Sequence, residues 1–340
     1  MYKLTVKASK RYQITISDSL DGFKEVVAKV ARGSKVAIVT DSNVNALYGN
    51  VLDGFLQGKA VYKYVVAAGE QSKSKQTYFD LLEKLCADGF SRTDTVIAFG
   101  GGVVGDLAGF VASTYMRGIS LVQVPTTILA AVDSSVGGKT AINLDAGKNL
   151  VGTFYQPSAV YVSTQFFNTL PKREVLSGMG EVIKYAFLNK SVTLPMIENG
   201  ASEQLVYQCL KIKRDVVQRD ERESGVRAQL NLGHTVGHAI ESLSGYAYSH
   251  GECVVKGMAY AIKLSQKIYG FDQETFDKMQ QLLTSCGHDL TCPYSAEQLI
   301  EKISHDKKGD GTAVKFVTVK DIGKPHVVKI DYPKLQEYIA

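Results

Sequence analysis

The spacing of apolar and polar residues in the first half of the chain predicts strands that alternate with helices. Short apolar runs rich in β-branched residues occur at residues 35–40, 60–67, 95–99 and 120–124. Between them apolar residues recur with helical period, for example over residues 76–88. Such alternation is typical of βαβ units and a mostly parallel sheet. Two earlier runs, 3–8 and 12–17, alternate apolar and polar positions and predict a hairpin.

After about residue 171 the helical period dominates. It extends over residues 181–188, 203–217, 234–243 and 252–269. Two β-rich runs within residues 314–330 flank Asp321-Ile-Gly323 and predict a second hairpin. We therefore expect an α/β N-terminal Rossmann-like domain with a mostly parallel sheet over residues 1–171. A mainly α-helical C-terminal domain is expected over residues 172–340.

Composition narrows the class of protein. With 340 residues, of which 45% are hydrophobic, the chain has enough apolar side chains for two cores. The net charge of +5 is small and the lysines are scattered, so nucleic acid is not an expected partner. The first residues lack the apolar run of a signal peptide or membrane span, which predicts a cytoplasmic protein with no membrane partner. The five cysteines form no CxxC pair and are expected to be buried thiols.

A glycine-rich turn follows the third parallel strand. Its sequence, Gly100-Gly-Gly-Val-Val-Gly105-Asp106, precedes an expected helix over residues 107–116. Such a turn brings backbone amides and the positive end of a helix dipole close to a pyrophosphate. The dinucleotide fingerprint also has an acidic residue after the next strand, which here ends in Val124-Pro-Thr-Thr127. The ribose contacts are therefore expected from Asp41 or Glu70, and a purely structural turn is the alternative.

A second glycine-rich string, Asp133-Ser-Ser-Val-Gly-Gly-Lys139-Thr140, ends like a Walker A loop. It has Asp133 where that motif requires glycine, which argues against an ATPase. Lys139, and Lys148 in Gly147-Lys-Asn149, nevertheless lie in loops where an ammonium can bind phosphate as a point charge. Surface lysines in turns are the alternative interpretation.

Three of the six histidines fall within seventeen positions, in Asn231-Leu-Gly-His234-Thr-Val-Gly-His238 and in His250-Gly-Glu252. Imidazoles this close indicate a metal site or a proton-transfer site. His234 and His238 are four residues apart and share one helix face, so the spacing favours them as a ligand pair. The glutamate of the HExxH motif is absent, and a zinc protease is not supported.

A third ligand is available in Gly178-Met-Gly-Glu181-Val-Ile-Lys184, which offers a carboxylate with a lysine three residues later. The start of an ordinary amphipathic helix is the alternative for this string. Cations follow in the next helix and loop, where an anionic substrate can recruit one or two and the others would face solvent. They are Lys213, Arg214, Arg219, Arg222 and Arg227.

Taken together, these strings resemble the 3-dehydroquinate synthase family, a member of the sugar phosphate cyclase superfamily. The resemblance extends from Asp41 to Lys308. Its strings are Gly-Glu-Gln-Ser-Lys73, Gly-Gly-Gly-Val-Val-Gly-Asp106, Tyr-Met-Arg117-Gly, Pro-Thr-Thr127, Asp133-Ser-Ser-Val-Gly-Gly-Lys139, Gly-Lys-Asn149, Gly-Glu181-Val-Ile-Lys184, Asn-Leu-Gly-His234 and His250-Gly-Glu. Two mild departures are Val236 and Tyr115, where phenylalanine is common in the family.

Position by position, the resemblance implies Glu181, His234 and His250 as metal ligands and His238 as a residue that faces the substrate. NAD⁺ would be held by Asp41, Asn43, Glu70, Lys73, Gly102, Val103, Val104, Gly105, Asp106, Thr126, Thr127, Lys139, Lys148, Phe166 and Thr169. Substrate contacts and catalysis would fall to Arg117, Asp133, Lys139, Asn149, Lys184, Lys213, Arg227, Asn231, His238 and a lysine of Asp306-Lys-Lys308, namely Lys307.

The implied substrate is an anionic sugar phosphate, 3-deoxy-D-arabino-heptulosonate 7-phosphate. The family oxidises it transiently with NAD⁺, eliminates phosphate, returns the hydride, opens the ring and closes a carbocycle by intramolecular aldol addition. NAD⁺ is thus recycled, and Zn²⁺ or Co²⁺ suits the ligand set equally. His238 and Lys184 would handle protons. Because the arginine matching Arg117 reaches a neighbouring subunit's site in the family, a homodimer is implied.

Three alternatives stay open at this point. A 2-deoxy-scyllo-inosose synthase shares most of the strings, but an acidic residue is expected there in place of Asn231. A net dehydrogenase, such as glycerol-1-phosphate dehydrogenase or an iron-type alcohol dehydrogenase, shares the two-domain plan and lacks the full strings around Lys184 and His234. A non-catalytic NAD-binding module would not need the ligand and lysine positions that this chain has.

Overall fold

The computed structural model describes residues 1–306 and 312–339, which form two compact units. The first unit comprises Met1–Leu170 and Lys213–Glu221, and the second comprises Pro171–Ile212 and Arg222–Ala340. The sequence had placed the segment Lys213–Glu221 with the second half. It contacts the first hairpin instead, because the backbone amides of Lys7 and Ser9 donate to the side chains of Gln218 and Glu221, each at 2.7 Å.

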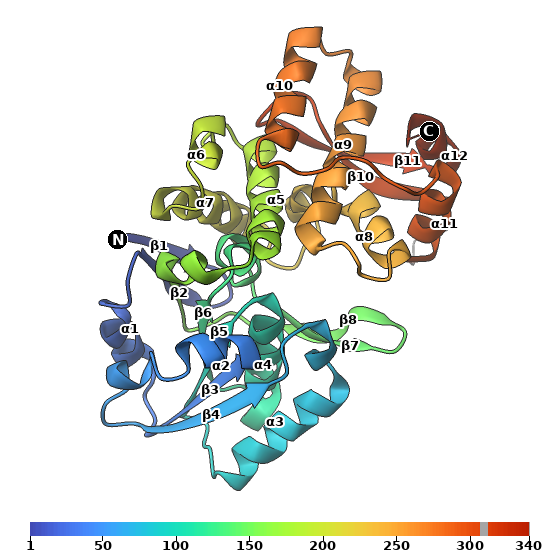
Figure 1. Cartoon of the computed structure of the whole chain (residues 1–340). Helices are drawn as coiled ribbons and strands as arrows, with labels where there is room; N and C mark the ends of the chain where they lie inside the picture. The colour runs from blue at the N-terminus through green and yellow to red at the C-terminus, as the bar shows by residue number, and fades with distance from the viewer. Residues whose placement is uncertain (307–311, 340) are drawn as a thin grey trace. The chain divides into compact units, whose positions relative to one another are not determined.

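Within the described residues, the first unit carries a seven-stranded sheet in the order β1-β2-β9-β6-β5-β3-β4 (Figure 1). The strands are β1 (Tyr2–Lys7), β2 (Arg11–Ser17), β3 (Lys35–Asp41), β4 (Ala60–Val66), β5 (Thr95–Gly100), β6 (Ser120–Pro125) and β9 (Ala159–Ser163). Only β1 and β2 pair antiparallel, and all other neighbours in this sheet are parallel. The predicted mostly parallel sheet and the first hairpin are confirmed.

The central strands are apolar throughout because both faces of the sheet are covered. Successive residues point to opposite faces, and in β5 Val96 and Ala98 join one core cluster while Ile97 and Phe99 join the other. Helices α3 (Lys75–Ala87) and α4 (Gly102–Thr114) contribute to the first cluster, and α1 (Phe23–Val30) contributes to the second. The continuous apolar runs that predicted buried strands are thus explained by helices on both sides.

Two features of this unit were not predicted. A hairpin of β7 (Lys139–Leu144) and β8 (Gly147–Phe154) occupies the stretch that the sequence suggested was glycine-rich loop. Most of β8 is exposed, so it lacks the alternation by which a half-buried strand is recognised. Helix α4 also begins at Gly102, inside the glycine-rich turn, and not at residue 107 as expected.

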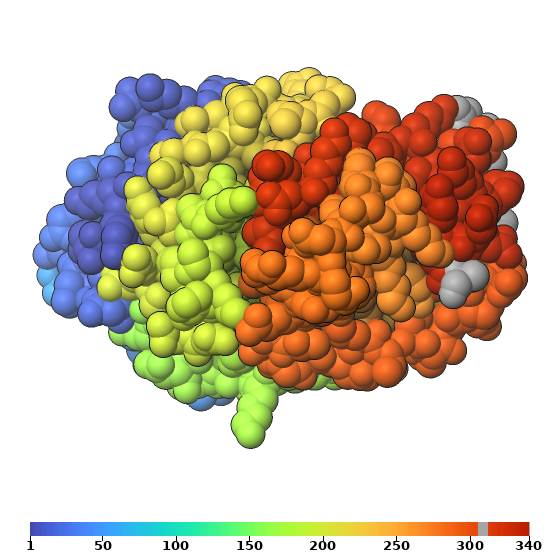
Figure 2. Space-filling view, turned by 90° about the horizontal axis from the view of Figure 1, so that it is seen from above, coloured from blue at the N-terminus to red at the C-terminus, as the bar shows by residue number. Residues whose placement is uncertain are grey.

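The second unit is mainly helical, as predicted (Figure 1). Its elements include α5 (Lys172–Leu188), α6 (Leu194–Glu198), the first part of α7 (Glu203–Arg219), α8 (His234–Leu243), α9 (His250–Tyr269), α10 (Gln273–Thr284), α11 (Ala296–Asp306) and α12 (Tyr332–Ile339), with a hairpin of β10 (Ala313–Val319) and β11 (Pro325–Asp331). In Figure 2 the red surface of this hairpin and of α12 lies beside the orange surface that includes α9, which contacts both β10 and α12. No helix among the described residues has the length and apolarity to cross a bilayer.

The cysteines correct one expectation. Cys209 and Cys253 are buried free thiols, as predicted, and Cys286 and Cys292 are partly buried. Cys86 on α3 is exposed, so the prediction of a buried thiol is wrong there. It lies on the solvent side of a helix whose buried face is formed by Tyr78, Leu81 and Leu85.

Asp94 ties the start of β3 to the loop before β5. Its buried carboxylate accepts hydrogen bonds from the backbone amides of Lys35 (2.9 Å) and Ser91 (2.7 Å) and from the Ser91 hydroxyl (2.8 Å). Gly33 packs so closely that a Cβ there would lie 2.2 Å from Asp94 Oδ1. Burial alone would raise the pKa of Asp94, but the hydrogen bonds from Ser91 and Lys35 outweigh it and hold that pKa below its usual value.

Asp94→Asn is expected to lower the free energy of unfolding by roughly 1–3 kcal/mol at neutral pH, because charge-assisted hydrogen bonds are lost. A carboxylate whose pKa is lowered by folding stabilises the protein above its unfolded pKa of about 3.9 and loses that effect as the pH falls through the folded pKa. Urea unfolding should therefore show a constant difference between wild type and variant down to about pH 5 and a shrinking one below about pH 4. An undiminished difference at about pH 3 would contradict this account.

Candidate functional site

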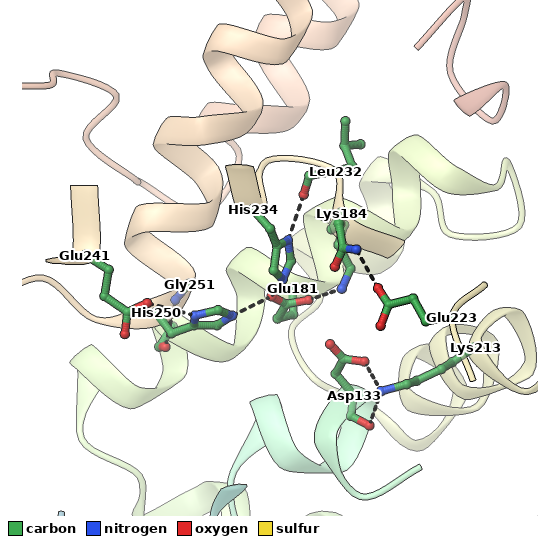
Figure 3. Close-up of polar contacts among 12 residues, drawn as sticks. Asp133, Glu181, Lys184, Lys213, Glu223, Leu232, His234, Glu241, His250 and Gly251 are labelled. Carbon is green, nitrogen blue, oxygen red and sulfur yellow. Dashed lines mark hydrogen bonds and ion pairs between the residues drawn. The ribbon is translucent and has the colours of Figure 1, made fainter. Parts of the chain in front are cut away.

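Glu181, His234 and His250 meet although they lie on three different helices, α5, α8 and α9 (Figure 3). Nε2 of His250 is 3.2 Å from Oε1 of Glu181, and Nε2 of His234 is 3.5 Å from the same oxygen. One ligand atom from each residue lies within 4.8 Å of the other two. The Glu181 side chain is fully buried, so this carboxylate forms the floor of the group.

Glycines allow the three helices to approach this closely. A Cβ on Gly251 would lie 1.9 Å from the carbonyl oxygen of Ser177, and a Cβ on Gly180 would lie 2.6 Å from that of Gly251. Between α8 and α9, a Cβ on Gly257 would lie 1.9 Å from the carbonyl oxygen of Gly233. These distances are far below van der Waals contact, so any larger residue would force the ligand-bearing helices apart.

Both histidines present Nε2 to Glu181 because Nδ1 is engaged elsewhere. Nδ1 of His234 lies 3.0 Å from the backbone carbonyl oxygen of Leu232, and Nδ1 of His250 lies 3.4 Å from Oε2 of Glu241. His250 is also the first residue of α9, whose start is fixed by a capping box between Ser249 and Glu252. The orientation of each ring is thus set before any ligand is considered.

The two imidazoles titrate in opposite directions. Burial lowers the pKa of His234 to about 3, although the Glu181 carboxylate opposes that effect. Burial would also lower the pKa of His250, but hydrogen bonds to Glu181 and Glu241 outweigh it and raise that pKa to about 10. At neutral pH the group therefore combines a neutral imidazole, that of His234, with the His250 imidazole, whose two carboxylate neighbours favour its protonated form.

This donor set fits a divalent metal. Two ligand atoms about 2.1 Å from a tetrahedral zinc ion are about 3.4 Å apart, close to the 3.2 Å and 3.5 Å between Glu181 and the two histidines. One carboxylate with two imidazoles also leaves a coordination position open, as catalytic zinc sites do. A second group, His238, Glu241 and His250, also has its ligand atoms within 4.8 Å of one another and shares His250. No group found among residues 1–306 and 312–339 contains both His234 and His238, the pair favoured by spacing.

The remaining predicted residues of the second unit are Lys184, Arg227, Asn231, His238 and Lys307. The buried ammonium of Lys184 pairs with Glu181, and buried Arg227 lies in the 3-10 turn Val226–Asn231. Asn231 and His238 line a cavity of about 130 Å³ beside His234. Lys302 also lines this cavity. The side-chain amide of Asn231 donates to Glu223 at 2.6 Å. The sequence assigned no role to Lys302 or Glu223. Lys307 lies outside the described residues.

In the first unit, Lys73 joins predicted residues from three segments. Its buried ammonium donates to Asp106 Oδ2 at 2.5 Å and to the side-chain oxygen of Asn149. The Asn143 side chain extends the network: it donates to Glu70 Oε1 at 2.7 Å and accepts from the backbone amide of Asn149 at 2.9 Å. Burial raises the pKa of Asp106 despite the opposing charge of Lys73. The sequence identified four of these five residues and missed Asn143.

The glycine-rich turn and its neighbours form the other predicted part of this unit. Asp41 ends β3, and its Oδ1 accepts from the amides of Asn43 and Val44, so it caps α2 (Ser42–Tyr48). The Thr126 amide donates to the Gly100 carbonyl at 3.0 Å, which holds the strand end beside the start of α4. Helix α4, which begins at Gly102, contains the other predicted residues of the turn, Val103, Val104, Gly105 and Asp106.

Other predicted residues of the first unit are more dispersed. The buried ammonium of Lys213 contacts the Asp133 carboxylate and donates to the Asp133 carbonyl at 2.7 Å. Phe166 is buried, and the Thr169 hydroxyl is 2.6 Å from that of Tyr48. Thr127 accepts from the Ala130 amide through its hydroxyl, Lys148 is half-buried, and Lys139 and Arg117 are exposed. These positions leave the assignments to NAD⁺ or substrate as predictions.

Comparison with solved structures places the fold in a class. A 2-deoxy-scyllo-inosose synthase solved with carbaglucose-6-phosphate, NAD⁺ and Co²⁺ is 26% identical, with a TM-score of 0.90 and 99% of each chain covered. An iron-containing alcohol dehydrogenase from Thermococcus thioreducens shares the fold alone, at 14% identity and a TM-score of 0.69 over 98% of this chain and 97% of that one. Fold and site together define a sugar phosphate cyclase.

Sequence comparison gives the family. The 3-dehydroquinate synthase N-terminal family model matches residues 63–177, and the C-terminal model matches residues 178–309. A 3-dehydroquinate synthase from Thermoanaerobacter pseudethanolicus is 44% identical over 329 residues, 92% of each chain. The chain belongs to the 3-dehydroquinate synthase family, as the resemblance of its motifs predicted.

The two overlapping groups predict different effects of two histidine substitutions. If a metal binds Glu181, His234 and His250, His234→Ala should lose more affinity for Co²⁺ than the roughly 10–100-fold that removal of an outer-shell partner costs. His238→Ala should bind Co²⁺ nearly as wild type does, and His250→Ala, which belongs to both groups, should lose binding. Equilibrium dialysis with elemental analysis measures all three. Loss of binding in His238→Ala with retention in His234→Ala would place the metal in the second group.

Proposed function

We propose that this chain converts 3-deoxy-D-arabino-heptulosonate 7-phosphate to 3-dehydroquinate and inorganic phosphate. The observation that carries the proposal is the Glu181, His234 and His250 group, built on glycine-packed helices in a chain of this family. Lys184 and the cavity lined by Asn231 and His238 adjoin the same group. The reaction serves aromatic amino-acid biosynthesis through the shikimate pathway, and we place it in the cytoplasm.

The proposal includes NAD⁺ and one divalent metal as cofactors. The 2-deoxy-scyllo-inosose synthase solved with NAD⁺ and Co²⁺ supports this choice. NAD⁺ supplies reversible hydride acceptance, and the metal supplies Lewis acidity toward substrate hydroxyls. A carboxylate with two imidazoles suits Zn²⁺ or Co²⁺.

The residues of the second unit would bind the metal and handle protons. Glu181, His234 and His250 would hold the metal. The ammonium of Lys184, which pairs with Glu181, would serve as a proton donor or acceptor beside the metal site. His238 lines the cavity with Asn231, where its imidazole can reach a bound hydroxyl.

The residues of the first unit would orient NAD⁺. The amino end of α4 at Gly102 offers free amides and a favourable dipole for the pyrophosphate. Lys73 fixes Asp106 and Asn149 in one network, so three segments of the proposed dinucleotide site move together. Lys139, which is exposed, and Lys148, which is half-buried, would bind the anionic groups of cofactor or substrate.

The order of bond changes explains why cations and proton carriers are both needed. Oxidation of one ring hydroxyl to a ketone acidifies the adjacent C–H, and loss of that proton expels phosphate. Return of the hydride restores the hydroxyl, the ring opens, and the enol attacks the released ketone to form the carbocycle. Substrate equals dehydroquinate plus phosphate, so NAD⁺ is neither consumed nor produced overall.

The test is to incubate the purified protein with the heptulosonate phosphate, NAD⁺ and Co²⁺, and to follow inorganic phosphate and absorbance of NADH together. Phosphate release without net NADH is expected, because the hydride is returned within each turnover. Stoichiometric accumulation of NADH would indicate a net dehydrogenase, and an inert protein would refute the proposal. Product identification by mass spectrometry separates dehydroquinate from other cyclisation products.

We further infer a homodimer in which Arg117 serves the partner's site. Arg117 is exposed, and both it and Met116 have left-handed backbone conformations, with φ of 67° and 49°. Such conformations cost energy in non-glycine residues and are retained where a function requires them. Met116, Leu150 and Phe154 are exposed large apolar residues of the same unit, which supports a covered surface.

Mixing two inactive variants tests this arrangement. Arg117→Ala and His250→Ala should each lose most activity as homodimers, because each removes one part of every site. Random reassociation makes half of the dimers hybrids with one intact site of two, so about a quarter of wild-type activity should return if Arg117 acts across the dimer. If Arg117 acts within its own chain, the two defects affect different sites and each hybrid has no intact site. Mixed samples that remain inactive would therefore contradict the inference.

A further inference from the structure

Glu241 contacts the nitrogen of His250 that faces away from Glu181 (Figure 3). Its Oε2 lies 3.4 Å from Nδ1 of His250, whereas Nε2 of the same ring lies 3.2 Å from Oε1 of Glu181. Two carboxylates therefore contact the two nitrogens of one imidazole. The Glu241 side chain is only 12% exposed, so little solvent competes for the contact.

The two ligand histidines are oriented by different kinds of acceptor. Nδ1 of His234 faces the carbonyl oxygen of Leu232, a backbone group two residues earlier that no substitution at that position removes. Nδ1 of His250 depends on a side chain, since its acceptor is the Glu241 carboxylate. An imidazole bound to a metal through one nitrogen carries a proton on the other, and that proton needs an acceptor.

We propose that Glu241 is a positioning residue: by accepting the Nδ1 proton of His250, it holds the ring so that Nε2 is directed at the metal. The negative charge behind the ring also strengthens the imidazole as a donor to the metal. This inference rests on the proposed metal site. It gives Glu241 a role through His250 without contact to metal or substrate.

The place of Glu241 in the fold fits this role. It lies in the last turn of α8, and its backbone carbonyl accepts from the Ser244 hydroxyl at 2.9 Å and from the Tyr246 amide at 3.0 Å. The connection that starts there ends at His250, the first residue of α9. Arg173 donates to the carbonyl of Ala247 within this connection. Glu241 therefore contacts both ends of the connection between α8 and α9: its backbone carbonyl contacts the start, and its side chain contacts His250 at the end.

The second metal-ligand group, His238, Glu241 and His250, offers an alternative role in which Glu241 is itself a ligand. A metal in that group would use Nδ1 of His250 and leave Nε2 for the Glu181 carboxylate. The two roles differ in their consequences. If Glu241 is a ligand, removal of its carboxylate removes a bond to the metal. If Glu241 positions His250, a neutral acceptor of the same shape can take over part of its role.

The test compares Glu241→Ala and Glu241→Gln by titration of the metal-free protein with Co²⁺ in the absence of NAD⁺ and substrate. Glu241→Ala should weaken Co²⁺ binding by roughly 10–100-fold, the usual effect of removing an outer-shell acceptor. Glu241→Gln keeps an acceptor but loses its charge, and a neutral hydrogen bond is about half as strong, so a loss of about 3–10-fold is expected. Both variants should keep the visible absorption band of the wild-type cobalt protein, because the ligands are unchanged.

Glu274→Ala is the matched control, since Glu274 is a helical glutamate of the same unit with a 77% exposed side chain on α10. It should bind Co²⁺ as wild type does. If Glu241→Ala fails to fold, as judged by circular dichroism of the metal-free protein, Glu241→Gln decides alone. Affinity within twofold of wild type in the folded variants would overturn the inference. Loss of binding as complete as in His250→Ala, or a shifted cobalt band, would overturn it in favour of direct ligation. Failure of wild type to bind Co²⁺ would refute the proposed metal site itself.

Discussion

The close packing of α5, α8 and α9 is the constraint on which the second unit depends. Glycines at these contacts bring backbone against backbone, and only then can a buried carboxylate on one helix reach imidazoles on two others. Burying Glu181 would be costly by itself. The ammonium of Lys184 and the two imidazoles surround it with positive or proton-donating groups. Packing and electrostatics thus depend on each other here, because a wider helix spacing would leave the carboxylate buried without its partners.

A buried cation has a similar effect in the first unit. Lys73 contacts Asp106 at the start of α4 and Asn149 in β8, and the backbone of the same residue accepts from Asn143 at 2.7 Å. These hydrogen bonds tie β8, the exposed strand of the β7–β8 hairpin, to the glycine-rich turn, while β7 also packs on the core through Ala141 and Ile142. A surface segment held in this way keeps its position while its outer face stays free for other contacts.

The sequence predicted the elements whose physical basis is local. Apolar runs identified the buried strands, and helical periodicity identified α8 and α9 within two residues of their observed bounds. The hairpin of β7 and β8 was missed because β8 is mostly exposed and lacks the alternation of apolar and polar residues that marks a half-buried strand. The roles of Asn143, Glu223 and Glu241 were missed because each depends on a partner, and the contact of Asn143 with Glu70 spans 73 residues. Glu241 had one local signal, its position three residues after His238 on the same helix.

For the three histidines, sequence spacing and the structure favour different pairs of metal ligands. Residues four apart share a helix face, which made His234 and His238 the natural ligand pair. Their rings are 5.3 Å apart, and so are those of His234 and His250, so proximity does not separate the two pairs. The difference lies in the Glu181 carboxylate, to which His234 and His250 both present Nε2. Ligands from separate helices can approach one point from different directions. Two side chains on one face of a helix extend from that helix in roughly the same direction. A compact three-ligand group is therefore easier to build from α5, α8 and α9 together than from α8 alone.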